Sequence, residues 1–345
     1  MIFKNVQLIP TLVLLIAVPC AAEWVNISDP VVTQLQKEGK KIGYPGHTAG
    51  ITVDPKSGDL YMIICDNGVW KSTDQGVSFT RVDGGAIGGR CETGWALSFD
   101  PTGGRLACFM IYGNAASTED AGKTWKKWST NHLDFGAVDW AGGGRTMLSF
   151  RHESGGILCV THDGGATWSN LGRTGPDNKI LKEDRDFKAL GLLDARTFVA
   201  TKGEGILRSD DAGATWKPAT IQHERGSKVK LNAPLMIHSP DAKTAYWASD
   251  VGLIASTDQG KTWMVQSNTN ALHGPYFGKD AGHFVMVGKE GFIETKDAGK
   301  TWEKIAPLPT GYTVGLVGPN FAWDSQRGIF YASSMGKPAY RWNRK

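Results

Sequence analysis

The chain has 345 residues, with 38 basic and 34 acidic side chains, 44 glycines and 13 tryptophans. A charge so close to balance, with no basic stripe and no aromatic nucleic-acid motif, excludes nucleic acid as the expected partner. Abundant glycine without a long helical pattern favours short strands joined by tight turns, so we expect an all-β protein.

The first segment, residues 1–22, has the pattern of a secretory signal peptide. Lys4 gives it a positive start, and an apolar core over residues 8–18 is followed by the small residues Ala21 and Ala22. This core is too short to span a bilayer. We therefore expect cleavage near Ala22, a mature chain over residues 23–345 without a transmembrane segment, and a secreted or periplasmic protein.

One eight-residue motif then recurs six times. Its copies lie at residues 72–79, 118–125, 161–168, 209–216, 256–263 and 295–302, with Asp-to-Asp spacings of 46, 43, 48, 47 and 39 residues. In a tight turn, Asp, Ser and Thr side chains accept backbone N–H bonds, and Gly takes a positive φ without steric cost. The aromatic residue that ends each copy opens a strand and packs between sheets. Such a period indicates the blades of a propeller rather than a helical solenoid.

Three further strand patterns complete each unit. Residues 96–99 and 105–110, for example, lie upstream of the second copy, and residues 156–160 lead directly into the third. After Trp302 we expect strands at 312–317, 328–332 and 339–342, and the N-terminal residues 23–27 supply the missing fourth. This pairing removes two open sheet edges. The sequence therefore predicts a single seven-bladed β-propeller with four-stranded blades over residues 23–345, closed by its N-terminal strand.

The motif S/T-x-D-x-G-x-T-W resembles the Asp box, also called the BNR repeat. Asp boxes occur in sialidases, xyloglucan-active hydrolases, some polysaccharide lyases, sortilin-type receptors and photosystem II assembly factors, so the resemblance implies a propeller but no single function. Sialidases carry a Phe/Tyr-Arg-Ile-Pro segment near the first blade, whereas residues 43–47 here read GYPGH, without arginine. Xyloglucan hydrolases usually fuse two propellers, and this chain has the length for one. No family site residue is carried over.

Metal sites and cofactors are not expected. A lone Asp in a turn supplies too few ligands for calcium, so we interpret the six repeat aspartates as structural. No CxxC pair and no His-x-His spacing occurs. We expect a Cys65–Cys91 disulfide, because both cysteines fall on one face of the meander, and we expect Cys108 and Cys159 to be buried as small apolar residues.

A meander places all six motifs on one face, so binding residues are sought in the loops of the opposite face, which we call the mouth face. Among these loops His132 precedes a first strand and His152 follows the second strand of the same blade, which brings the two together. Histidines and aromatic residues that begin inner strands have packing as their alternative role. The candidate catalytic residues are His132, His152 and Tyr276, and the candidate substrate-binding residues are His47, Arg90, Glu92, Asp134, Arg151 and His273.

A mouth rich in charged and aromatic side chains favours a carbohydrate-active enzyme. Hydrolysis needs two carboxylates, for which Glu92, Asp134 and Asp186 are candidates. Elimination from a uronate needs a cation for the carboxylate and a base for the proton, and the arginines, histidines and Tyr276 suit those roles better. We expect a monomer that binds and cleaves an anionic polysaccharide, as a lyase or a glycoside hydrolase. The alternative is a non-catalytic glycan-binding or protein-assembly propeller.

Overall fold

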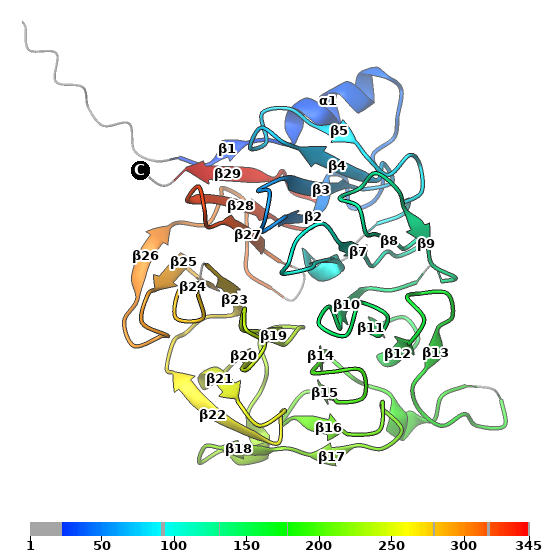
Figure 1. Ribbon diagram of the computed structural model, residues 1–345, viewed down its shortest axis with the longest axis vertical. Coiled ribbons are helices and arrows are strands. Elements are labelled where there is room, and N and C mark those ends of the chain that lie inside the picture. Colours follow the sequence, from blue (N-terminus) through cyan, green and yellow to red (C-terminus); the bar gives the residue numbers. More distant parts are fainter. Residues whose placement is uncertain are drawn as a thin grey trace, which may run out of the picture.

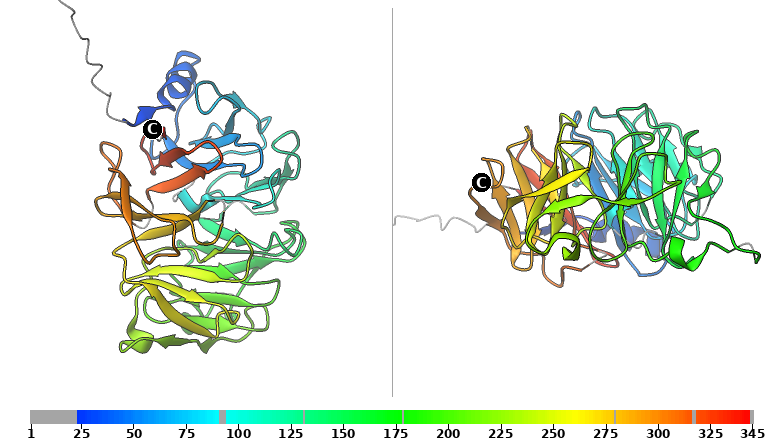
Figure 2. Two further views of the ribbon diagram at one scale, coloured as in Figure 1. Left: turned by 60° about the vertical axis from the view of Figure 1, so that its left-hand side comes forward. Right: turned by 90° about the horizontal axis from the view of Figure 1, so that it is seen from below.

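The computed structural model describes residues 23–90, 94–130, 132–177, 179–278, 280–315 and 318–343. Seven sheets stand around a central axis (Figure 1), and together they form a thick disc when seen from the side (Figure 2). The predicted all-β, seven-bladed propeller is confirmed. The predicted signal peptide at residues 1–22 lies outside the described residues. In the part of the chain that the structure describes, no helix is long and apolar enough to cross a bilayer.

Each blade is a meander of four strands, which follow one another from the axis outward. Blades 1 to 3 consist of β2 (Thr48–Val53), β3 (Leu60–Ile64), β4 (Val69–Ser72), β5 (Thr80–Arg81); β6 (Leu97–Phe99), β7 (Leu106–Cys108), β8 (Ala116–Thr118), β9 (Lys126–Lys127); and β10 (Phe135–Val138), β11 (Met147–Arg151), β12 (Ile157–Thr161), β13 (Ser169–Asn170). Blades 4 and 5 consist of β14 (Ala189–Leu192), β15 (Phe198–Thr201), β16 (Leu207–Ser209), β17 (Lys217–Pro218); and β19 (Ile237–His238), β20 (Ala245–Ser249), β21 (Gly252–Ser256), β22 (Thr262–Ser267). Blades 6 and 7 consist of β23 (His273–Phe277), β24 (Phe284–Gly288), β25 (Gly291–Thr295), β26 (Glu303–Ala306); and β27 (Asn320–Asp324), β28 (Ile329–Ser333), β29 (Tyr340–Asn343), β1 (Val25–Asn26).

The strands form where the sequence has short apolar runs, because each blade is packed between two others. Every residue of β3 and of β20 is buried. The tryptophans that end the repeats fill the gaps between and within blades. Trp263 is fully buried against Trp247, and Trp168 packs on Trp128 with ring centroids 5.6 Å apart. The core is therefore a ring of sheet-to-sheet layers rather than one central cluster.

The ring is closed by the N-terminal strand, as predicted. Val25 and Asn26 pair with Arg341 and Tyr340 on the outer edge of blade 7. The Trp24 ring lies 5.3 Å from that of Trp342 and 5.5 Å from that of Phe292. Because the first strand completes the last blade, the two ends of the described chain are held together (Figure 1).

Three elements differ from the sequence expectation. The innermost strand of blade 7 is β27 rather than the predicted strand at 312–317, of which residues 316 and 317 lie outside the described residues. Gly315 and Gly318 are joined by mutual backbone hydrogen bonds, which form a turn before β27. A helix, α1 (Asp29–Lys37), follows β1, and blade 5 gains a fifth strand, β18 (Thr220–Gln222), parallel to β22. Pro30 in its first turn and the buried Val31, Val32 and Leu35 fix α1, a pattern too short to stand out in the sequence. Three short 3₁₀ helices are η1 (Gly94–Ala96), η2 (Lys182–Asp184) and η3 (Gly226–Lys228).

The six repeats form the turns between the third and fourth strands, on the face that we call the repeat face. In the third copy, Gly165 N donates to Thr161 Oγ1 at 3.0 Å, and Thr167 N and Oγ1 donate to the two carboxylate oxygens of Asp163. Gly165 has a φ of 85°, which only glycine adopts without strain. The same bond from the glycine N recurs in the other copies, so the predicted structural role of the repeat aspartates agrees with their contacts.

The hydrogen bonds to the repeat carboxylates make the stability of the fold depend on pH, so that it falls in acid. They hold the pKa of Asp74, Asp120, Asp211 and Asp297 at about 2, below the usual value of about 3.9. A carboxyl whose folded-state pKa is depressed adds stability above the unfolded pKa and loses it as the pH falls toward the folded value. We therefore expect the melting temperature to fall between about pH 4 and about pH 2. Thermal denaturation of the double variant Asp120→Asn/Asp211→Asn should show a shallower dependence on pH, whereas Asp177→Asn, outside the repeats, should follow the parent.

Candidate functional site

The mouth face of blades 1 to 3 holds a continuous group of charged and aromatic side chains. They come from the segments that lead into β2, η1 and β10 and from the loops that follow β7 and β11: Tyr44, Arg90, Tyr112, His132, Asp134, His152 and Glu153. A short backbone ladder aligns these segments. Ile111 pairs with Arg90 on one side and with His132 on the other. The site is therefore assembled by main-chain pairing between blades, not by one loop alone.

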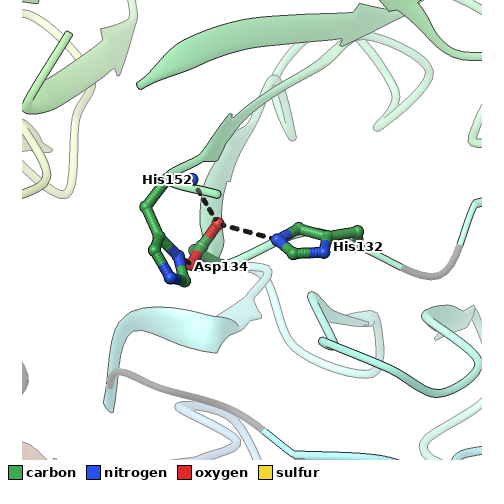
Figure 3. A group of neighbouring side chains, drawn as sticks. All are labelled: His132, Asp134 and His152. Atoms are coloured by element: carbon green, nitrogen blue, oxygen red, sulfur yellow. Dashed lines mark hydrogen bonds and ion pairs between the residues drawn. The ribbon is translucent and has the colours of Figure 1, made fainter. Parts of the chain in front are cut away.

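Asp134 and His152 form the centre of this group (Figure 3). Asp134 lies immediately before β10. Because Phe135 of β10 pairs with Phe150 of β11, the loop that follows β11 places His152 next to Asp134. The carboxylate is hydrogen-bonded to Nδ1 of the His152 ring and accepts the His152 backbone N–H at 3.0 Å. Burial raises the pKa of Asp134, and the bonds from His152 act against that rise. The side chain is 41% exposed, and its Nε2 lies 3.7 Å from Oε1 of Glu153.

His132 lies on the other side of the same carboxylate. Its Nε2 is 3.7 Å from Oδ2 of Asp134, and its Nδ1 is 3.5 Å from Oε2 of Glu153. The ligand atoms of His132, Asp134 and His152 all lie within 4.8 Å of one another, which is close enough to share one cation. These three residues do not form a contiguous sequence motif and meet only through the meander of blade 3 (Figure 3).

Tyr112 and Arg90 extend the group toward blade 1. Tyr112 has a φ of 55°, a strained conformation for a bulky residue, and its hydroxyl donates to Glu153. The Arg90 guanidinium lies 4.9 Å from the Tyr112 ring centre and 5.0 Å from that of Tyr44. The bond from Tyr112, with the positive charges nearby, holds the pKa of Glu153 below its usual value. Tyr44 is 65% and Tyr112 56% exposed, so two exposed aromatic rings border the half-buried side chain of Arg90.

The close approach of residues 88–90 to 111–113 depends on Gly113. A Cβ there would lie 2.0 Å from the carbonyl oxygen of Gly88, whereas a Cβ at Gly88 itself would meet nothing within 4 Å. We expect Gly113→Ala to push the two segments apart, to cost about 1–3 kcal/mol of stability, and to separate Arg90 from Tyr112. Melting curves and ligand binding measure both effects. Gly88→Ala adds the same methyl group in open space, and an equal loss in both variants would contradict this reason.

Four predicted site residues lie apart from this group. His47 Nε2 is 2.9 Å from Asp29 of α1. The Arg151 guanidinium donates to Thr130 and Asn170, and thus faces away from the two histidines. His273 and Tyr276 lie inside the ring of blades. A fifth predicted residue, Glu92, lies outside the described residues.

The interior position of His273 and Tyr276 argues against chemistry at the mouth. Both pack on Trp95, and Tyr276 also packs on Phe321. Burial lowers the pKa of His273 and raises that of Tyr276 well above its usual range, so neither side chain is charged at neutral pH. A cavity of about 360 Å³ on the axis, lined by the innermost strands of all seven blades, includes Tyr276 among its walls.

The predicted Cys65–Cys91 disulfide is wrong for the structure described. Cys65 is a free thiol with no exposed surface, packed in the core between blades 1 and 2, and Cys91 lies outside the described residues. Burial raises the pKa of Cys65 to about 11. Cys108 and Cys159 are buried and free, as expected.

Sequence reasoning did not select Tyr44, Tyr112 and Glu153 as site residues. The sequence feature that could have identified them is their position in mouth-face loops of the same three blades as Arg90, His132 and His152. Ordinary solvated loops carry the same residue types, so only the ladder through Ile111 and the side-chain contacts of these three residues distinguish them.

Comparisons with known proteins support the fold and give a coarse functional direction. No family model matches the chain. A stretch of 240 residues is 27% identical to a xyloglucanase of Hypocrea jecorina, and the match covers 64% of this chain and 25% of that enzyme. The GH74 enzyme of Niastella koreensis matches with a TM-score of 0.55 and 14% identity, over 92% of this chain and 53% of the other. YCF48 bound to a D1 peptide matches with a TM-score of 0.53 and 14% identity, over 87% and 93%.

The structural matches at these identities concern the fold alone. The chain spans a quarter of the length of the curated xyloglucanase that it matches. It is therefore a seven-bladed propeller with low sequence similarity to part of a glycoside hydrolase.

Proposed function

We propose that this propeller binds an acidic extracellular polysaccharide on the mouth face of blades 1 to 3 and cleaves it by elimination. The observation that carries the proposal is the His152 ring held at Nδ1 by the buried Asp134, next to His132, which in turn contacts the exposed Tyr112 with the Arg90 guanidinium over its ring. A ring oriented in this way presents Nε2 as a proton acceptor. The arginine supplies the positive charge that a uronate needs.

The proposed step uses four groups. Arg90 holds the uronate carboxylate, and Nε2 of His152 takes the proton from the carbon next to that carboxylate. The electron pair left on this carbon forms a double bond to its neighbour, whose bond to the glycosidic oxygen breaks. Tyr112 gives that oxygen a proton, so the products are a new chain end and an unsaturated sugar. His132, on the other side of Asp134 from His152, is the fourth group and lines the site beside it.

Hydrolysis is the second candidate, because the sequence similarity is to a xyloglucanase. It needs two carboxylates on opposite sides of the scissile bond. Asp134 is buried and bonded to His152, which leaves Glu153 as the accessible carboxylate of the described group. The elimination set is therefore the more complete one among the described residues. Secretion or export to the periplasm and a monomeric state are part of the same proposal.

The test is a panel of acidic and neutral polysaccharides incubated with residues 23–345. Reducing ends together with ultraviolet absorbance from unsaturated sugars support elimination. Reducing ends without that absorbance support hydrolysis instead. Retention of the protein on an affinity gel with no new ends means a glycan-binding propeller, and no binding at all contradicts the proposal.

Arg90 and Arg151 offer a matched pair for the carboxylate-binding role. We expect Arg90→Ala to weaken binding of the acidic substrate by about 10- to 100-fold, the usual value of a charge-assisted hydrogen bond. Arg151→Ala should have little effect on binding, because its guanidinium lies on Thr130 and Asn170, apart from the two histidines. Isothermal titration with an oligosaccharide of the active polymer measures both. Equal losses in the two variants would remove Arg90 from this role.

A further inference from the structure

Each of the two histidines of the site lies between two carboxylates. His132 Nε2 and His152 Nδ1 face Asp134, whereas His132 Nδ1 lies 3.5 Å and His152 Nε2 3.7 Å from the oxygens of Glu153. Histidines that bind a metal ion commonly have this arrangement, in which the outer nitrogen is oriented by a second carboxylate. Asp134 is therefore the inner carboxylate, and Glu153 the outer carboxylate, for the same pair of rings.

The inner atoms lie close enough together to bind one ion when the hydrogen bond between His152 Nδ1 and Asp134 gives way to it. Bonds of about 2.1 Å from a tetrahedral ion place two ligand atoms roughly 3.4 Å apart. Nε2 of His132 and Oδ2 of Asp134 are 3.7 Å apart, and the full set lies within 4.8 Å. Nε2 of His132 is also buried and has no hydrogen-bond partner among the described residues, which is costly for a ring nitrogen.

The ligand set selects the class of ion. Two imidazole nitrogens and one carboxylate oxygen suit zinc and neighbouring transition metals, whereas magnesium and calcium prefer oxygen ligands. Three protein ligands leave a position open to water or to a ligand oxygen.

We propose that His132, Asp134 and His152 bind one Zn²⁺ ion, and that the bound ion blocks the proton transfer assigned to His152; this second part rests on the proposed function. With Asp134 on Nδ1, the neutral ring has its lone pair on Nε2 and accepts a proton there. With zinc on Nδ1, the neutral ring carries its hydrogen on Nε2, directed at Glu153, and accepts none. The same ring is thus a base without the ion and an inert ligand with it.

Calorimetric titration of ZnCl₂ into untagged residues 23–345 at constant pH tests the site. We expect one ion per chain, no comparable binding of MgCl₂, and a loss of affinity of at least tenfold in His132→Ala. His162→Ala removes a histidine on the repeat face and should bind zinc as the parent does. Asp134→Asn, checked first by its melting curve, should lose affinity as well. Absent binding, or binding that His132→Ala leaves unchanged, would overturn the site.

The second part is decided by activity on the polysaccharide found in the panel. Zinc at a saturating concentration should lower the rate, and a chelator should restore it. Activation by zinc, or cleavage unaffected by it, would overturn the blocking role. Without any cleaved polysaccharide the blocking role falls together with the proposed function, whereas the zinc site is still decided by calorimetry alone.

Discussion

Replacing His152 by alanine is expected to lower the rate of polysaccharide cleavage by about 10²- to 10⁴-fold, the usual contribution of a positioned base. Nε2 of His152 is the proton acceptor in the proposed step, and the alanine variant has no group in its place. The side chain is 41% exposed and is held mainly by Asp134, so its loss should change the melting temperature little. The measurement is the initial rate of unsaturated product at saturating substrate, beside a melting curve.

His162→Ala is the matched control, because it removes a histidine from the repeat face of the same blade. It should retain the parent rate. If His152→Ala cleaved at the parent rate, the proton acceptor would lie elsewhere, and an equal loss of rate and stability would make His152 a structural residue.

Removing residues 23–28 is expected to destabilise the whole ring. The deletion takes away β1, the Trp24 ring between blades 6 and 7, the buried Ile27, and the bond from Ala339 N to Ser28 Oγ. Truncation of a buried isoleucine alone costs about 2–5 kcal/mol. The exposed edge of β29 adds a tendency to associate. Melting of residues 29–345 should therefore occur several degrees below that of residues 23–345.

Val25→Ala is the control for this deletion, because Val25 is 49% exposed within the same strand. It should melt close to the parent, whereas Ile27→Ala should lose a large part of the stability that the deletion removes. Identical melting of the truncated and full chains would show that closure by β1 does not stabilise the ring.

The fold could be predicted because its information is local and repeated. Six copies of one turn fix the blade period. Trp24 precedes its strand in the same way as the repeat tryptophans, so closure of the ring by the N-terminal strand could be predicted. The elements that were predicted wrongly lie in segments outside the repeats. The helix α1 has only three buried residues in nine, and the glycines around 315–318 shift the last inner strand to β27.

The site could be predicted in part, because a meander determines which loops share a face but not where each side chain points. His132, Asp134 and His152 belong to one blade, and the structure brings them together. Arg151 is the neighbour of His152 in sequence, yet alternation along β11 turns its guanidinium to Thr130 and Asn170. Tyr276 was predicted in a mouth-face loop, but it lies within the inner strand β23, and its side chain packs on Trp95 inside the ring of blades.

The proposed zinc site was not expected from the sequence, since its three residues do not share one short motif. His132 and Asp134 are two residues apart, but the third ligand comes from the following hairpin loop. Only the pairing of β10 with β11 brings His132, Asp134 and His152 together. Tertiary pairing is thus the information that the sequence pattern lacked.

The most direct test of the proposed mouth-face site is a crystal structure of His152→Ala with an oligosaccharide of the polysaccharide that the parent cleaves. We predict sugar density over blades 1 to 3, with a ring against Tyr44 or Tyr112 and a carboxylate on Arg90. An oligosaccharide bound to the repeat face, or within the cavity on the axis, with the mouth face of blades 1 to 3 empty, would contradict it.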